Sequence, residues 1–518
     1  MPIRKKSIVT GAFILAAANI LTRLLGFVYR IYMSNAIGAE GMGLYQLVLP
    51  LYSLAWSIAC SGFTTTVSKL VAQENAKREY GNMGRVLKQS LFITCAISAI
   101  LTVLMYSFAG TIGETFFNDT RVVMPIRILA LAIPVMAAGS CIRGYFLGLQ
   151  ETVVPAVSQV LEQCVRMIVI YSLAGLFIPR GLEYACAAAV LGIFCGELVS
   201  FLYILYSYRS FKTKHKLKNK PNLSPVQCLT LIFSMALPLT GNRISGSLLA
   251  TLENVLIPQR LIMYGMTQKE AISAFGRITG MVMPLVMFPS ALLHALSVSL
   301  VPAISEATAV SDNERITNTV SKSFLFTSIV GIGACAVFLT VPDELGKIIY
   351  NQDIGRILFI FGTMCPFLYL NITMSGILNG LGHQVFIFRT SLITSCINLF
   401  CIYFFVPKFG VTAFIAGWFA GMLYSVFTSL RKIGNGANIN IKAGDWFVKP
   451  VLSAAAATLT VRFISRTLIF PAVGGIIGLL ASLFMILLFY MGFIIILKCI
   501  TADDLRSLYK KSRALPIS

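Results

Sequence analysis

Two arginines lie inside the first long apolar stretch of the sequence, where lipid would be the expected surroundings. Arg23 and Arg30 are seven residues apart in the run from Ile8 to about Met33, so a helix presents them on one face. Asn19 precedes Arg23 by four residues on that face. A membrane helix keeps such cations only where they meet water, protein or an anionic ligand. The pattern predicts a positively charged cavity in a membrane carrier, although Arg30 could instead extend to the outer interface.

Further charged residues interrupt the later apolar spans. Glu162 and Arg166 have the i,i+4 spacing, acid first, of an intrahelical ion pair, which either neutralises itself or contacts a substrate. Glu197 is a single acid that either pairs across helices or takes up a coupling cation. The other candidates for cavity binding are Arg243, Asn254 and Arg277, and those for coupling or gating are Glu253, Lys69, Glu74 and Glu306.

The composition requires lipid as the solvent for most of the surface. Of the 518 residues, 57% are hydrophobic and only 12% are charged, and the mean hydropathy is +0.81. We therefore expect an all-α polytopic membrane protein with about fourteen transmembrane helices. The predicted spans are 8–33, 44–70, 89–110, 122–146, 153–178, 184–207, 228–258, 277–301, 321–341, 355–379, 385–406, 411–430, 447–468 and 471–498.

The positive charge has a topological explanation. The formal net charge is +22, but the cations gather in alternate loops, as the positive-inside rule requires. Basic groups precede the first span (Arg4, Lys5 and Lys6) and fill the loop after the sixth. Both termini are therefore predicted in the cytoplasm of a bacterial cell membrane. This distribution argues against a nucleic-acid partner.

The two halves of the chain are predicted to be repeats. Span four ends with Gly144 and Gly148 and span ten with Gly376 and Gly380, each pair in a G-xxx-G pattern that allows close helix approach. Spans two and eight end near Glu74 and Glu306, and a Pro-Arg/Lys turn with a glycine precedes spans six and twelve. Spans one to six and seven to twelve would form two parallel six-helix lobes. The predicted domains are 1–209 (N-lobe), 210–226 (basic cytoplasmic linker), 227–432 (C-lobe) and 433–518 (two further helices and a basic cytoplasmic tail).

No enzyme motif is present. The three histidines, His215, His294 and His383, are dispersed, and the twelve cysteines have no metal-ligand spacing. No nucleotide-binding loop occurs in a suitable context. We expect neither catalysis, nor a cofactor, nor a bound metal. The energy for transport would come from an ion gradient, the membrane potential or the substrate's own concentration gradient.

The start of the chain resembles a known family. The segment Thr22-Arg23-Leu24-Leu25-Gly26-Phe27, followed by Ile37-Gly38-Ala39-Glu40-Gly41-Met42-Gly43-Leu44-Tyr45, is similar to the polysaccharide-exporter branch of the multidrug/oligosaccharidyl-lipid/polysaccharide (MOP) superfamily. Within that branch the chain resembles the stage V sporulation protein B group, relatives of the lipid II flippases. Arg23 matches an arginine that lines the flippase cavity. The next cavity arginine of the flippases falls at Tyr29, one place before Arg30, and Lys69 stands alone where span two of the flippases carries two arginines.

The resemblance implies a MATE/MOP-like fold and an alternating-access flippase. Its substrate would be an undecaprenyl-pyrophosphate-linked glycan, such as lipid II or a similar precursor, used in spore cortex or cell-wall synthesis. The planar fork of arginine suits a pyrophosphate, which agrees with the charged face around Arg23. Two alternatives remain, a cation-coupled drug or small-molecule exporter of the same superfamily and a non-transporting scaffold for cell-wall enzymes. The implied partners are the lipid-linked glycan, the bilayer and cell-wall synthesis enzymes.

Overall fold

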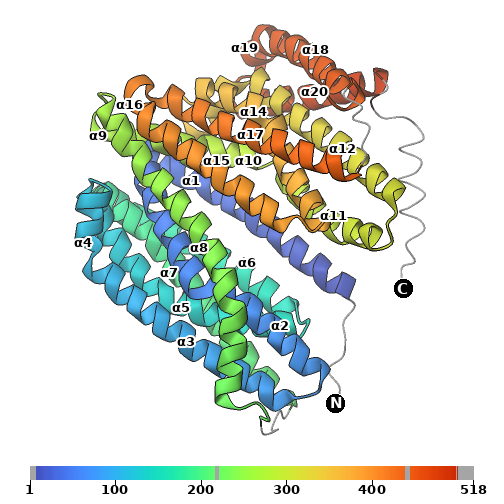
Figure 1. The fold of residues 1–518 in the computed structure, drawn as a ribbon. Coiled ribbons are helices and arrows are strands. Elements are labelled where there is room, and N and C mark those ends of the chain that lie inside the picture. The colour runs from blue at the N-terminus through green and yellow to red at the C-terminus, as the bar shows by residue number, and fades with distance from the viewer. Residues whose placement is uncertain (1–7, 216–220, 438–443, 498, 500–518) are drawn as a thin grey trace. The chain divides into compact units, whose positions relative to one another are not determined.

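The computed structural model describes residues 8–215, 221–437, 444–497 and 499. The N-terminal cations, the centre of the basic linker and nearly all of the basic tail lie outside the described residues. Within the described part, every regular element is a helix (Figure 1). Helices satisfy their own backbone hydrogen bonds, which a segment surrounded by lipid must do. The predicted all-α fold is confirmed.

The helices follow the predicted spans closely. The short helices are α4 (Ala109–Thr111), α9 (Gln268–Gly276), α10 (Met283–Met287), α13 (Pro342–Tyr350), α16 (Val406–Phe409) and α19 (Phe470–Val473). The long helices are α1 (Ile8–Trp56), α2 (Gly62–Ala76), α3 (Tyr80–Ser107), α5 (Val123–Gly148), α6 (Val153–Phe177), α7 (Leu182–His215), α8 (Pro225–Met263), α11 (Ala291–Ala309), α12 (Asn313–Thr340), α14 (Gly355–Gly380), α15 (Gln384–Phe404), α17 (Val411–Ala437), α18 (Lys449–Ile464) and α20 (Gly475–Ile496).

Twelve helical segments among the described residues are long and apolar enough to cross a membrane. One of them, 13–76, combines the first two predicted spans, which are separated inside α1 by Gly38 with a φ of 68°. The seventh predicted span corresponds to α8, which is not among the twelve in this part of the chain. The protein is therefore a multi-pass membrane protein, and the count of fourteen crossings stays a prediction.

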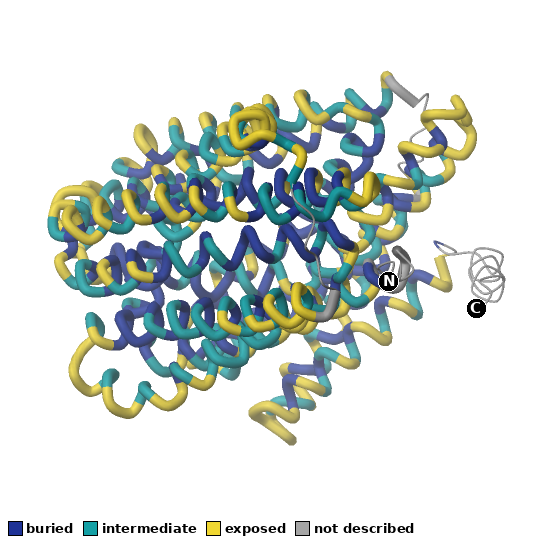
Figure 2. Tube along the Cα trace, turned by 90° about the horizontal axis from the view of Figure 1, so that it is seen from below, coloured by how far each residue is buried: buried dark blue, intermediate teal, exposed yellow. Residues whose placement is uncertain are grey.

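The chain forms two compact units. Unit 1 comprises 1–280 with 399–414, and unit 2 comprises 281–398 with 415–518. The predicted lobe boundaries remain predictions. Buried and exposed residues alternate along the same helices (Figure 2), and many exposed side chains are large and apolar, including Phe92 and Leu459, which are 77% and 72% exposed. Such surfaces fit a lipid environment.

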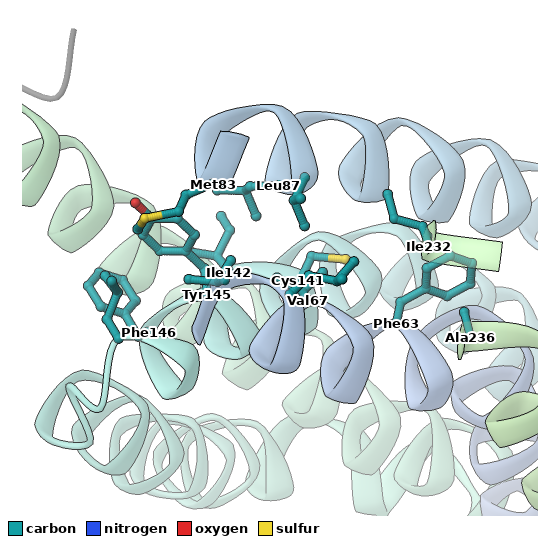
Figure 3. Close-up of a cluster of buried hydrophobic side chains, with 14 of the residues drawn as sticks. Phe63, Val67, Met83, Leu87, Cys141, Ile142, Tyr145, Phe146, Ile232 and Ala236 are labelled. Carbon is teal, nitrogen blue, oxygen red and sulfur yellow. The ribbon is translucent and has the colours of Figure 1, made fainter. Parts of the chain in front are cut away.

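The core of unit 1 is centred on α5. Helices α2, α3 and α7 pack against it, and Val67, Leu87, Cys141 and Tyr145 are among the side chains that fill the space between them (Figure 3). Glycines set the spacing between α5 and α2. A Cβ at Gly144 would lie 2.5 Å from the Thr64 carbonyl oxygen, and one at Gly148 would lie 2.5 Å from that of Ser68.

The core of unit 2 repeats this arrangement around α14. Helices α11 and α12 pack against α14, and α18 and α20 add a second cluster against α12. A Cβ at Gly376 would lie 2.7 Å from the Ser297 carbonyl oxygen, and one at Gly380 would lie 3.1 Å from that of Val301. Both G-xxx-G pairs therefore permit the close helix approach predicted from the sequence. Gly144 and Gly148 of unit 1 therefore correspond in position to Gly376 and Gly380 of unit 2.

The end of the basic linker is fixed to the turn between α2 and α3. The Asn82 Oδ1 atom accepts hydrogen bonds from the backbone N–H groups of Asn222 (2.8 Å) and Leu223 (3.0 Å). Asn82 Nδ2 donates to Glu74 (2.7 Å), and Arg85 donates to the Leu223 carbonyl oxygen. Since α8 begins two residues after Leu223, this turn anchors the start of α8 within unit 1.

The region predicted as one span at 277–301 is broken. A π-helical stretch, Arg277–Val282, is followed by α10, and α11 begins only at Ala291. Pro289 lies in the gap, where a residue without a backbone N–H disfavours helix continuation. Pro50, Pro134 and Pro366 lie within continuous helices.

Candidate functional site

Four charged side chains from three helices form one network inside unit 1. Arg143 on α5 donates through Nη2 to Glu197 on α7 (3.2 Å) and to Glu162 on α6 (3.4 Å). Arg166, one turn after Glu162, donates to its other carboxylate oxygen at 2.9 Å. We refer to Arg143, Glu162, Arg166 and Glu197 as the charged quartet. Its two guanidinium groups balance its two carboxylates.

Two neutral side chains complete the network. The Tyr52 hydroxyl of α1 donates to Glu197 Oε1 at 2.6 Å, and the Ser200 hydroxyl accepts from Arg143 at 3.2 Å. The charged side chains are largely enclosed, with exposures from 4% for Glu197 to 19% for Arg143. Enclosed charges persist only when they are paired and hydrogen-bonded. The quartet is therefore neutral overall, and each of its carboxylates has an arginine partner.

Small residues on α7 bring α6 close enough for this pairing. A Cβ at Gly196 would lie 2.7 Å from the Glu162 carbonyl oxygen, and one at Gly192 would lie 3.1 Å from that of Arg166. The i,i+4 spacing of the two glycines matches that of Glu162 and Arg166. The glycines therefore hold the polar face of α6 against α7.

Both predicted acids have arginine partners in the structure, and their substrate or coupling roles stay predictions. The predicted Glu162–Arg166 pair is confirmed, but it is part of a larger network and not an isolated pair. Glu197 pairs across helices with Arg143. Sequence reasoning missed Arg143, although an arginine within predicted span four is itself a signal.

Helix α1 runs alongside α6 in the same direction. Near the start of both helices, a Cβ at Gly11 would lie 3.1 Å from Thr152. Further along, the rings of Tyr32 and Tyr171 are 5.7 Å apart. The residues of α1 between these contacts therefore lie at the level of the quartet's residues on α6.

The arginines of α1 lie away from most of its contacts with α6, since around the helix Arg23 is about 120° from Gly11 and about 180° from Tyr32. Gly26 points at Gln163, whose Nε2 atom would be 3.6 Å from an added Cβ. With 3.6 residues per turn, Arg23 and Arg30 lie within about 60° of the Gly26 direction. Arg23 and Asn19 are exposed and Arg30 is half-buried. In the described part of the chain neither arginine has an ion-pair partner. The charge of these two cations is therefore not compensated by an ion pair among the described residues.

The cavity candidates on α8 and α9 have separate surroundings within unit 1. The guanidinium of Arg243 lies 5.5 Å from the centre of the Trp56 ring. Trp56 follows Tyr52 by one helical turn on α1. Asn254 donates to the Ala250 carbonyl oxygen of its own helix at 2.7 Å. Arg277 is half-buried at the end of α9.

The coupling and gating candidates outside the quartet are spread over α2, α8 and α11. Glu253 on α8 is half-buried and Lys69 on α2 is exposed. Glu74 is buried and bonded to Asn82 and Lys77. Glu306 is exposed and lies 3.1 Å from Arg315, so the acids that end spans two and eight differ in surroundings.

Solved structures identify the fold. A structure of the lipid II flippase MurJ in an inward closed conformation has a TM-score of 0.68 at 13% identity, over 93% of this chain and 98% of that one. An inward-facing multidrug resistance MATE transporter of the MOP superfamily has a TM-score of 0.62 at 14% identity, over 80% of this chain and 95% of that one. The fold is that of a MOP-type membrane transporter.

Residues 8–308 match the family described as Polysaccharide biosynthesis protein, and the chain belongs to this family. It is 30% identical to stage V sporulation protein B of Bacillus subtilis (strain 168), over 97% of this chain and 98% of that protein. It is 28% identical to the lipid II flippase MurJ of the same organism, over 83% and 84% of the two chains. The resemblance drawn from the Arg23 segment is confirmed. This is a family of transporters and flippases, not of enzymes.

Proposed function

We propose that the protein is an alternating-access flippase for an undecaprenyl-pyrophosphate-linked glycan, lipid II or a similar precursor. It would act in the bacterial cytoplasmic membrane, with both termini in the cytoplasm, and serve spore cortex or cell-wall synthesis. Family membership and the relatives stage V sporulation protein B and lipid II flippase MurJ support this proposal. Cell-wall synthesis enzymes would be its protein partners.

The observation that carries the proposal is the pair of uncompensated arginines on α1. Because the quartet is neutral by itself, the positive charge of Arg23 and Arg30 remains available to an anionic ligand. A pyrophosphate diester is dianionic and accepts paired hydrogen bonds from guanidinium groups. Arg23 would hold this group, with Arg243 and either Arg30 or Arg277 contributing.

The quartet argues against the rival transporter. A cation-coupled exporter needs a carboxylate that can exchange its partner for a proton, a metal ion or a cationic drug. Both carboxylates of the quartet are held by arginine, and Glu197 is held by Tyr52 as well. We therefore assign the quartet a structural role, fixing α5, α6 and α7 around the α1 arginines.

Native mass spectrometry of the detergent-purified protein titrated with lipid II tests the proposal. We expect saturable binding to the wild type and a loss of about tenfold or more for Arg23→Ala, because a hydrogen bond to a charged group is worth about 1.5–3 kcal/mol. Arg127→Ala is the matched control. Arg127 is also an exposed helical arginine, but its guanidinium lies near the Tyr106 ring instead, so its removal should leave binding unchanged.

Two results would contradict the proposal. If wild type does not bind lipid II, this cargo is excluded, and cationic drugs or the scaffold function become the leading interpretations. If Arg23→Ala and Arg127→Ala weaken binding equally, the effect is one of overall charge and Arg23 does not hold the headgroup.

A further inference from the structure

Unit 2 contains a hydroxyl-lined cavity at the position that corresponds to the charged quartet of unit 1. The cavity has a volume of about 520 Å³, within the range of about 300–1,000 Å³ typical of small-molecule sites. Eight of its lining residues are serines or threonines, and none of the residues lining it is a carboxylate, a lysine or an arginine. Asn371, His294 and Trp418 complete its polar and aromatic surface.

The two G-xxx-G pairs establish the first correspondence. Arg143 directly precedes Gly144, and Ser375 directly precedes Gly376. Both glycines lie against a carbonyl oxygen of the neighbouring helix, α2 in unit 1 and α11 in unit 2. Ser375, which lines the cavity, therefore takes the place of the arginine at the centre of the quartet.

A second pair of contacts gives the other correspondences. Gly192 of α7 lies against the carbonyl oxygen of Arg166, and Gly421 of α17 lies against the Thr394 carbonyl oxygen and the Asn398 side chain. Arg166 comes 18 residues after Gly148, and Asn398 comes 18 residues after Gly380. Asn398 thus takes the place of Arg166. Thr394, one turn before Asn398, takes the place of Glu162 and lines the cavity. Short neutral side chains stand where unit 1 has long charged ones, and the volume they leave is the cavity.

The polar groups of this cavity have unused hydrogen-bonding capacity. Among the described residues, the hydroxyl groups of Ser375, Ser391 and Ser395 form no hydrogen bond. Asn398, which is 7% exposed and is not one of the lining residues, also has an Oδ1 atom without a partner among the described residues. Ser391 is exposed and Ser375 and Ser395 are half-buried, so their hydroxyl groups are accessible to a molecule in the cavity. A ligand that both donates and accepts hydrogen bonds would satisfy them.

We propose that this cavity binds a sugar residue of the transported glycan. The inference rests on the proposed function and adds a glycan-specific subsite within unit 2. A neutral sugar has several hydroxyl groups, each able to donate and accept, and the lining hydroxyl groups have the same capacity. Trp418 supplies apolar surface for the C–H face of a sugar ring. With no charged side chain in the lining, the cavity suits the neutral part of the substrate and not its pyrophosphate.

The test compares two lipids that share the undecaprenyl pyrophosphate group and differ in the glycan and stem peptide esterified to it. Lipid II and undecaprenyl pyrophosphate are titrated by native mass spectrometry against wild type and against the triple variant Ser391→Ala, Thr394→Val, Ser395→Ala. Each lost hydrogen bond is worth about 1 kcal/mol, or about fivefold in affinity. We expect the triple variant to bind lipid II at least about tenfold more weakly and to bind undecaprenyl pyrophosphate as wild type does.

Two further variants guard against a folding artefact. Thr428→Val removes a hydroxyl that bonds within its own helix, to Tyr424 at 2.8 Å, and that does not line the cavity; its affinities should be unchanged. Ser395→Leu fills the cavity and should reproduce the selective loss. The midpoint of thermal unfolding is recorded for every variant.

Each other outcome has one meaning. Equal affinity of wild type for the two lipids, or equal weakening of both by the triple variant, overturns the sugar subsite and leaves the flippase proposal standing. Unchanged lipid II binding by the triple variant also overturns the sugar subsite and leaves the flippase proposal standing. Failure of wild type to bind either lipid overturns the proposed function and this inference together.

Discussion

Removing Arg143 should destabilise unit 1 more than removing any exposed arginine. Arg143→Met deletes the hydrogen bonds to Glu197, Glu162 and Ser200 and leaves two enclosed carboxylates with Arg166 as the one cation of the quartet. Breaking a buried pair from one side costs about 3–5 kcal/mol. We expect Arg143→Met to lower the free energy of unfolding by an amount in this range.

A double-mutant cycle separates the pairing from the loss of side-chain volume. Glu197→Gln removes the negative charge opposite Arg143 but keeps an acceptor for Tyr52. If the two groups are coupled, the double variant will be less destabilised than the sum of the single variants by about 0.5–3 kcal/mol. Arg127→Met is the matched control, and its effect should be within about 0.5 kcal/mol because Arg127 is exposed.

Reversible unfolding of the detergent-solubilised protein, followed by helical circular dichroism, measures each free energy difference. Additivity of the two single variants within about 0.5 kcal/mol would refute the reasoning. In that case the 3.2 Å contact would carry no energetic coupling, and the quartet could not be the group that fixes α5 to α7.

Two further predictions concern helix packing and pH. Gly144→Val should lower the free energy of unfolding of the detergent-solubilised protein by about 1–3 kcal/mol, because its Cβ would lie 2.5 Å from the Thr64 carbonyl oxygen. Gly175→Val on α6 is the control, since an added Cβ there meets nothing within 4 Å. This variant should cost much less in the same unfolding assay. His383 lies between α14 and α15, and its partial burial and the nearby Lys432 lower its pKa. The unfolded chain therefore binds the proton more readily than the folded protein does. The free energy of unfolding should fall as the pH drops through about 6.5. His383→Asn should show a smaller fall in the midpoint of thermal unfolding between pH 7.5 and 5.5, and an unchanged fall would exclude His383 as its source.

Much of the fold is readable from the sequence because lipid imposes a strong rule. Long apolar runs must be helices, and the G-xxx-G pairs mark where α5 and α14 approach their neighbours. The Glu162–Arg166 pair is equally visible, because both residues lie on one helix at a fixed spacing. These features depend only on local sequence.

Contacts between helices are less visible in the sequence. In a membrane protein the lipid-facing and the packed sides of a helix are both apolar, so hydropathy does not define the rotation of a span. The pairing of Arg143 with Glu197 depends on the rotations of α5 and α7, and the cavity of unit 2 depends on three helices at once. Pro289 within the predicted span 277–301 indicates a kink, but the apolar composition on both sides of it does not show that the helix ends before Ala291.

The neutrality of the charged quartet has an electrical consequence. Moving one elementary charge through a membrane potential of 100 mV changes the energy by about 2.3 kcal/mol. A group of two guanidinium ions and two carboxylates that moves as one body does no net work in that field. Voltage therefore acts on the remaining charges of this region, Arg23 and Arg30. On the proposed function, a dianionic headgroup bound there would cancel their charge, so the empty carrier would respond to voltage at this site and the loaded carrier would not.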